Sequence, residues 1–166
     1  MTAPTYGNMG DHTETVQVDY DPQRISYAQL LDIFWTSHDP SRQSGSRQYL
    51  QAVFTHNEDQ HRQALASKTA LAQKIGRAVK TEVRSLRFFT MAEDYHQKYN
   101  LKSHAALRRE MARIYPDPRN FVNASATTRL NGYAGGYGTG DQLAREIDLL
   151  GLSAAGKKQL ADLLRR

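Results

Sequence analysis

Cysteine is missing from the sequence: none of the 166 residues is a Cys. Disulfides, thiolate zinc sites, iron–sulfur clusters and cysteine nucleophiles all need that side chain, so this chain supplies none of them. The sequence also lacks an apolar run of the roughly 20 residues that a membrane span requires, and its first residues do not read as a signal peptide. These absences predict a soluble, cytoplasmic protein without a membrane partner.

The charge balance and composition are those of an ordinary globular protein. Lys and Arg number 22 against 17 Asp and Glu, and 39% of the residues are hydrophobic, which argues against wholesale disorder. The basic residues are scattered along the chain, whereas nucleic-acid-binding proteins gather them on one face. We therefore expect no nucleic-acid partner.

The first regular pattern is the alternation from Thr13 to Tyr20. It places Glu14, Val16 and Val18 on one side and predicts a strand with one buried face, ended by Asp21-Pro22. A carboxyl on that face would be partly desolvated and suited to donating a proton near neutral pH. The alternative is that Glu14 is solvated, or paired with an arginine, at the start of the strand.

The rest of the first half alternates between helix and strand signals. Ser26 begins a helix with an apolar stripe that contains Trp35, and Asn57 with Gln60 resembles a capping box for a second helix. Residues 49–56 and 79–83 have the composition of strands. The order is β-α-β-α-β, which predicts helices packed on a mixed sheet.

The second half is predicted to be mainly helical. The expected features are a helical turn at 93–99, a helix capped by Ser103 and broken by Pro116 and Pro118, a glycine-rich loop at 131–138, and helices near 141–150 and 153–165, with Gly151 and Ser153 as caps. The glycine-rich loop lacks the Walker lysine and the GxGxxG spacing, so we interpret it as a surface loop rather than a phosphate site.

A metal site is the weaker alternative for the start of the chain. His12 and Glu14 share one side of the predicted strand, but the pattern places no third ligand beside them. We therefore expect no metal.

Several ordered blocks resemble the peptide methionine sulfoxide reductase A family. They are Pro4-Thr5-Tyr6, Gly10 to Pro22, Ile25-Ser26-Tyr27, Phe34-Trp35, His38-Asp39-Pro40, Arg47-Gln48-Tyr49, Ala52-Val53-Phe54 and Ala92-Glu93-Asp94-Tyr95-His96-Gln97-Lys98-Tyr99. The resemblance implies an α+β fold, a mixed β-sheet with packed helices. It also implies a reductase-like core over residues 1–102 and a helical C-terminal extension over 103–166, packed on that core.

The resemblance also implies roles for three residues. In the family a cysteine thiolate attacks the sulfoxide sulfur, a glutamic acid protonates the oxygen, and tyrosine hydroxyls hold that oxygen. These roles place the catalytic proton donor at Glu14 and the substrate-binding hydroxyls at Tyr6 and Tyr49. An acidic residue usual in the loop before Tyr49 has no counterpart, since Ser44-Gly45-Ser46 stand there.

The family's Gly-Cys-Phe-Trp-Gly motif has no match in this sequence. Three readings follow: a shortened or split, inactive reductase; a pseudoenzyme that binds methionine sulfoxide weakly; or a structural or interaction module derived from the family. We expect no bound cofactor. Thioredoxin or another thiol reductant is expected to act only if the missing segment is supplied. The expected partners are methionine sulfoxide in peptides, the missing N-terminal fragment or a second copy of the chain.

Overall fold

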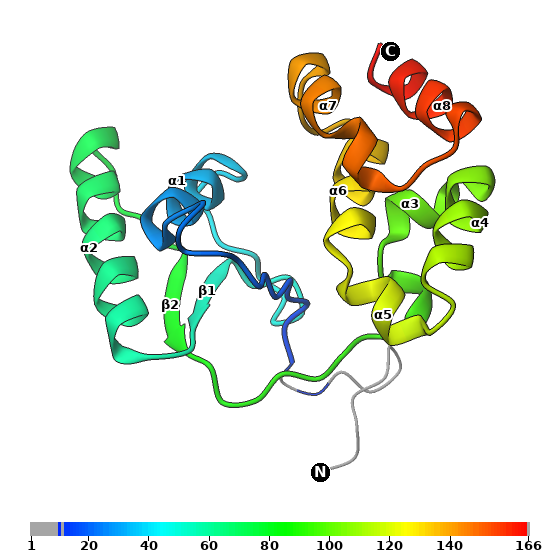
Figure 1. Ribbon diagram of the computed structural model, residues 1–166. Helices are drawn as coiled ribbons and strands as arrows, with labels where there is room; N and C mark the ends of the chain where they lie inside the picture. Colours follow the sequence, from blue (N-terminus) through cyan, green and yellow to red (C-terminus); the bar gives the residue numbers. More distant parts are fainter. Residues whose placement is uncertain (1–9, 11, 166) are drawn as a thin grey trace. The chain divides into compact units, whose positions relative to one another are not determined.

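The computed structural model describes residue 10 and residues 12–165. Contacts divide the chain into two compact units, Met1–Thr90 and Met91–Arg166. In the first unit the order is α1 (Tyr27–Thr36), β1 (Ala52–Thr55), α2 (Glu58–Ile75) and β2 (Glu82–Ser85). Figure 1 shows β1 and β2 side by side, with α2 alongside them. The two strands are parallel, with Val53 opposite Val83.

Local capping explains where the two helices of this unit begin. The Ser26 hydroxyl accepts a hydrogen bond from the Gln29 backbone N–H, and the Gln29 side chain accepts one from the Ser26 N–H. Asn57 caps α2 through the Gln60 N–H, and Gly76 ends it with φ 64°, a left-handed conformation that glycine adopts without strain. Both predicted helices are confirmed.

The core of the first unit lies between the helices and the strands. Its buried hydrophobic residues are Leu31, Trp35, Ala64 and Val79, with Val53, Val83 and apolar side chains of α1 and α2 packed against them. The Trp35 indole N–H donates to the Ser67 hydroxyl at 3.1 Å, so α1 and α2 are joined by a polar contact as well.

The prediction of a strand at Thr13–Tyr20 is wrong, because no strand forms there. These residues have no regular secondary structure, and the Val16 and Val18 side chains are 86% and 58% exposed. An alternating pattern forms a strand only beside another strand, because its backbone groups need partners. In the described part of the chain the sheet consists of β1 and β2 alone, so it is parallel rather than mixed.

The second unit is helical. Its elements are a 3-10 turn η1 (Asp94–His96), α3 (Tyr99–Ser103), α4 (Ala105–Ile114), α5 (Pro118–Asn123), α6 (Ser125–Ala134), α7 (Gly140–Glu146), a 3-10 turn η2 (Ile147–Leu150) and α8 (Ala154–Leu164). Figure 1 shows α3, α4, α6 and α8 grouped together. They enclose a core that includes Leu101, Leu107, Met111, Leu130 and Leu160, each fully buried.

Three details of the second half differ from the prediction. Ser103 ends α3, and the residue before α4 is His104, which makes no side-chain cap. Pro118 begins α5, the position where a missing N–H costs nothing. Residues 131–134 of the predicted glycine-rich loop belong to α6, because Leu130 and Tyr133 are buried at helical spacing.

Other predictions for this unit are confirmed. The turn at 93–99 contains η1, Gly151 adopts φ 74°, and the Ser153 hydroxyl caps α8 through the Gly156 N–H. The fold class is α+β, as predicted. The predicted boundary after residue 102 stays a prediction, while the compact units separate between Thr90 and Met91, so that α3 lies wholly in the second. No helix within residues 12–165 is long and apolar enough to cross a membrane.

Candidate functional site

Two of the three predicted site residues, Glu14 and Tyr49, lie in the described part of the first unit, whereas Tyr6 lies outside the described residues. The Glu14 N–H donates to the Gln48 carbonyl oxygen at 2.9 Å. The Gln48 side-chain amide donates back to Glu14 Oε1 at 2.7 Å. The structure therefore brings the predicted proton donor to the residue directly before Tyr49.

A further contact aligns the two segments. The Thr13 hydroxyl donates to the Arg47 carbonyl oxygen at 3.0 Å, one residue before the Glu14–Gln48 pair on both sides. Residues 13–14 thus run beside residues 47–48. These contacts join segments that are 34 residues apart in the sequence.

The surroundings of Glu14 differ from the prediction. The Glu14 side chain is exposed, and that of Tyr49 is 58% exposed. Glu14 does not lie on a buried strand face as predicted, because no strand forms at Thr13–Tyr20. Glu14 instead lies at the surface with its carboxylate oriented by Gln48.

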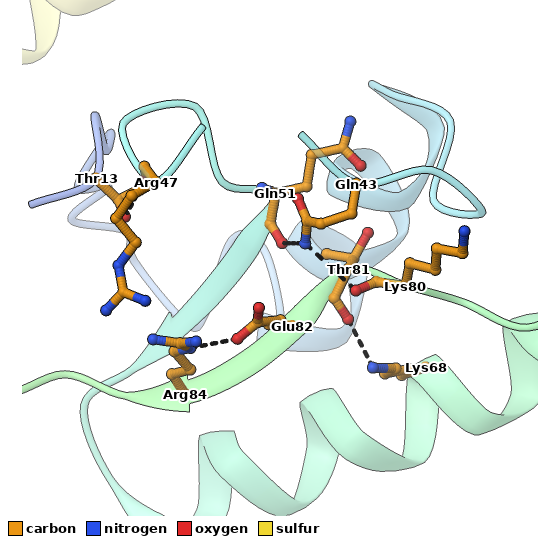
Figure 2. Close-up of polar contacts among 9 residues, drawn as sticks. All are labelled: Thr13, Gln43, Arg47, Gln51, Lys68, Lys80, Thr81, Glu82 and Arg84. Atoms are coloured by element: carbon orange, nitrogen blue, oxygen red, sulfur yellow. Dashed lines mark hydrogen bonds and ion pairs between the residues drawn. The ribbon is translucent and has the colours of Figure 1, made fainter. Parts of the chain in front are cut away.

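The loop that leads to Tyr49 is held by the side chain of Gln43. Its Oε1 accepts from the Gln51 N–H at 2.7 Å, and its Nε2 donates to the Gln51 carbonyl oxygen at 3.0 Å (Figure 2). One amide side chain thus satisfies both backbone groups of Gln51, as a neighbouring strand would. This contact fixes the chain just before β1, two residues after Tyr49.

The start of that loop is held by His38, in the His38-Asp39-Pro40 block. Its Nδ1 lies 3.0 Å from the Phe34 carbonyl oxygen, and its Nε2 lies 2.9 Å from the Thr81 hydroxyl oxygen. A carbonyl only accepts, so the proton belongs on Nδ1 and Nε2 accepts from the hydroxyl. The imidazole therefore joins the end of α1 to the chain entering β2.

Thr81 is also held through its backbone. The Lys68 ammonium group on α2 donates to the Thr81 carbonyl oxygen at 2.6 Å (Figure 2), and the Pro40 carbonyl oxygen accepts from the Lys80 N–H at 2.8 Å. Thr81 itself is fully buried. The scaffold beneath the loop is thus fixed by hydrogen bonds from α1, α2 and the loop.

His12 packs against an aromatic ring. The His12 and Phe88 rings lie 5.2 Å apart, centre to centre, in an edge-on arrangement. In the described part of the chain, no three His, Asp or Glu side chains lie close enough together to hold a metal ion. The contact adds a third segment, just after β2, to the surroundings of residues 12–14.

Sequence reasoning gave Gln48 and Phe88 no role. Gln48 stands in the Arg47-Gln48-Tyr49 block, but its contact with Glu14 spans 34 residues, and no local pattern encodes it. Phe88 belongs to none of the motifs or periodic patterns described above. Their nearness to residues 12–14 is a property of the fold.

Comparison with known proteins decides the family. A sequence profile described as "Peptide methionine sulfoxide reductase" matches residues 1–130. This chain belongs to the peptide methionine sulfoxide reductase family.

Individual reductases of this family extend the match. The chain is 39% identical over 154 residues to "Peptide methionine sulfoxide reductase" of Drosophila melanogaster, an alignment that covers 90% of this chain and 61% of the fly protein. It is 38% identical over 139 residues to "Peptide methionine sulfoxide reductase A5" of Arabidopsis thaliana, covering 80% of this chain and 54% of the plant protein. With "Peptide methionine sulfoxide reductase MsrA 1" of Synechocystis the identity is 42% over 113 residues, covering 60% of this chain and 51% of that protein.

The chain thus spans about half to six tenths of the length of these reductases. An alignment that covers 90% of the chain includes residues of both compact units. The helical second unit is therefore shared, at least in part, with the fly protein.

Proposed function

We propose that this chain carries the proton-donating and oxygen-binding part of a peptide methionine sulfoxide reductase site. Membership of the family supports the reaction, and the bond from the Gln48 amide to Glu14 Oε1 at 2.7 Å is the observation that carries the proposal. It holds the proposed acid beside the segment that ends in Tyr49. The substrate is methionine sulfoxide in peptides and proteins.

Each proposed role follows from the chemistry of a sulfoxide. The sulfoxide oxygen is a hydrogen-bond acceptor. A protonated carboxyl group and phenolic hydroxyl groups can donate hydrogen bonds to it. Glu14 gives the proton that the oxygen takes up as the S–O bond breaks, while the hydroxyls of Tyr49 and Tyr6 hold that oxygen in place. The Gln48 amide keeps the carboxyl oriented toward the site.

The remaining step needs a thiolate. In the family reaction the thiolate attacks the sulfoxide sulfur, the oxygen passes to the cysteine as a sulfenic acid, and methionine is released. None of the 166 residues is a Cys, so the thiolate has to come from outside these residues. Thioredoxin or another thiol reductant has a role only when such a thiolate is supplied. The 166 residues alone bind the sulfoxide without reducing it.

Exposed apolar side chains near the site support a partner segment. Val16 and Val18 are 86% and 58% exposed in a stretch that alternates like a strand. Apolar surface of this kind favours pairing with another strand. We assign that role to a fragment that carries the Gly-Cys-Phe-Trp-Gly motif or, without it, to a second copy of the chain. A cytoplasmic location without a nucleic-acid or membrane partner is also part of the proposal.

A chimera tests the role of Glu14. The chain is fused behind a segment with the Gly-Cys-Phe-Trp-Gly motif from a cysteine-containing member of the family, and reduction of N-acetyl methionine sulfoxide amide by dithiothreitol is measured. The chimera is expected to turn over, and Glu14→Ala to lower its turnover about 100-fold, as loss of a general acid does. The matched control is Glu58→Ala in the first turn of α2, which should leave the rate within about twofold because Glu58 is an exposed surface residue.

The unfused chain should give no turnover above a no-protein control. Thiol-dependent turnover by the chain alone, or a chimera that works equally well without Glu14, would contradict the proposal.

A further inference from the structure

One side of α4 in the second unit is lined with arginines. Arg108, Arg109 and Arg113 are exposed, while Leu107 and Met111, on the other side of the helix, are fully buried. With 3.6 residues per turn, the three arginines fall within an arc of about 140° around the helix axis. We call these three residues the α4 arginine face.

No carboxylate of the second unit neutralises this face. Within residues 12–165, the guanidinium groups of the three arginines form no ion pair. The carboxylate of Glu110, on the same helix, is used elsewhere: it accepts hydrogen bonds from the Ser153 backbone N–H at 2.8 Å and from the Ser153 hydroxyl at 2.7 Å. The arginine face therefore keeps its positive charge, since a guanidinium group stays protonated in proteins.

This arrangement is locally unfavourable for the helix. Arg109 and Arg113 are four residues apart, and like charges at that spacing destabilise a helix. No carboxylate in the described part of the chain compensates for the repulsion. A local conflict without compensation inside the fold is typical of a functional surface, where a partner supplies what the fold lacks.

We propose that the α4 arginine face is an interaction surface for an acidic segment of a partner protein, in which Asp or Glu side chains are closely spaced. The planar guanidinium group donates two parallel hydrogen bonds to a carboxylate, a geometry that lysine cannot reproduce. All three basic residues of α4 are arginines. The surface lies in the second unit and does not depend on the chemistry proposed for the first.

The extent of the face favours a protein segment over a nucleic acid or a membrane. The helix has 10 residues and is therefore about 15 Å long. A protein that binds the DNA backbone strongly neutralises about 6–10 phosphates, more than three arginines can serve. Five other basic residues of this unit already form ion pairs within the chain: Lys102, Arg129, Lys157, Lys158 and Arg165. A short acidic segment matches the charge that remains on α4.

The test is binding of a fluorescein-labelled peptide of alternating glutamate and glycine to the full chain, followed by fluorescence anisotropy. At a physiological salt concentration, charges more than about 8 Å apart are largely screened, so the signal reports on local contacts. The triple variant Arg108→Gln/Arg109→Gln/Arg113→Gln should weaken binding about tenfold, because each exposed pair contributes a factor of about 1.5–5. Gln has nearly the helix propensity of Arg, so the circular dichroism spectrum should not change.

A second triple variant serves as the matched control. Lys157→Gln/Lys158→Gln/Arg165→Gln changes the net charge equally, but at side chains that already pair with Asp148 or Asp162. Its affinity for the peptide should stay within about twofold of the wild type. In an NMR titration of the labelled wild type, the peptide should shift the signals of the α4 arginines most.

Three results would overturn the inference: no binding of the peptide by the wild type, equal weakening in the two triple variants, or NMR shifts centred away from α4. Tighter binding of a single-stranded oligonucleotide of the same net charge, or of phosphatidylserine vesicles, through the same arginines would replace the acidic protein with a phosphate-bearing partner. Should the arginine variant not fold, the NMR titration of the wild type decides. None of these results bears on the proposed function, which concerns the first unit.

Discussion

The hydrogen bond between His38 and Thr81 offers a sharp test of how the scaffold beneath the site is held. His38→Ala removes the acceptor at 2.9 Å from the Thr81 hydroxyl, which is fully buried. The other partner, the Phe34 carbonyl oxygen, keeps its hydrogen bonds from the Ser37 backbone N–H and hydroxyl. The substitution therefore leaves one buried hydroxyl without its partner.

The magnitude follows from that count. A buried polar group left without its hydrogen bond costs about 1–3 kcal/mol. The imidazole also packs against the Phe34 ring, with centres 4.7 Å apart, so its loss adds about 1 kcal/mol of packing. We expect His38→Ala to lower the free energy of unfolding of the first unit by about 2–4 kcal/mol. Thr81→Val should cost less, about 1 kcal/mol, because water can reach the half-buried His38.

Urea denaturation followed by the fluorescence of Trp35 measures this loss. Trp35 is the only tryptophan and is 6% exposed in the core of the first unit, so its emission reports on that unit. With a urea dependence of about 2 kcal/mol per molar, the midpoint for His38→Ala should fall by about 1–2 M. His56→Ala, at an exposed histidine, is the control and should change stability by less than about 0.5 kcal/mol.

The double substitution decides whether the hydrogen bond is the cause. The two single losses should exceed the loss in His38→Ala/Thr81→Val by about 1–2 kcal/mol, because the double variant leaves neither partner unpaired. Additivity to within about 0.3 kcal/mol would refute the reasoning.

Two further predictions concern the second unit. Burial and the hydrogen bond to Glu146 raise the pKa of Tyr133 above its ordinary value of 10.0, so its contribution to stability is fully present below pH 10 and is lost as pH rises through the raised pKa. Melting followed by circular dichroism between about pH 9 and 11 should therefore show a steeper loss in the wild type than in Tyr133→Phe; equal slopes would contradict this. Met91 is 59% exposed whereas Met111 is fully buried, so dilute hydrogen peroxide should oxidise Met91 at least about tenfold faster in the native protein, as measured by peptide mass spectrometry. Equal rates would show that the core around Met111 opens readily.

The features that the sequence predicted well are those encoded within a few residues. The capping of α1 by Ser26, of α2 by Asn57 and of α8 by Ser153 depends on contacts across one helical turn. The left-handed conformation of Gly151 depends on the residue itself. Such local signals do not depend on contacts with distant parts of the chain.

The predictions that failed depended on distant partners. The alternation at Thr13–Tyr20 is a sound strand pattern, but without a neighbouring strand its apolar side chains stay exposed. In the 131–138 segment the glycine content predicted a loop, yet burial of Tyr133 extends α6 to Ala134. The tertiary contacts outweighed the local preference there.

The candidate site shows the same division. Glu14 and Tyr49 were predicted by resemblance to the family, and their roles stay proposals. The contacts of Gln48 and Phe88 with the 12–14 segment cross 34 and 76 residues of sequence, and only the folded chain brings them together. No spacing rule links residues so far apart.

We propose that Glu14 and Tyr49 together form a site for the sulfoxide oxygen. This proposal is tested most directly by comparing the titration of N-acetyl methionine sulfoxide amide into the wild type with the titration into Glu14→Ala. We expect weak binding, in the millimolar range, with shifts centred on Glu14, Gln48 and Tyr49, and a clear loss of affinity in Glu14→Ala. Shifts centred on another part of the chain, or equal affinity without Glu14, would contradict it.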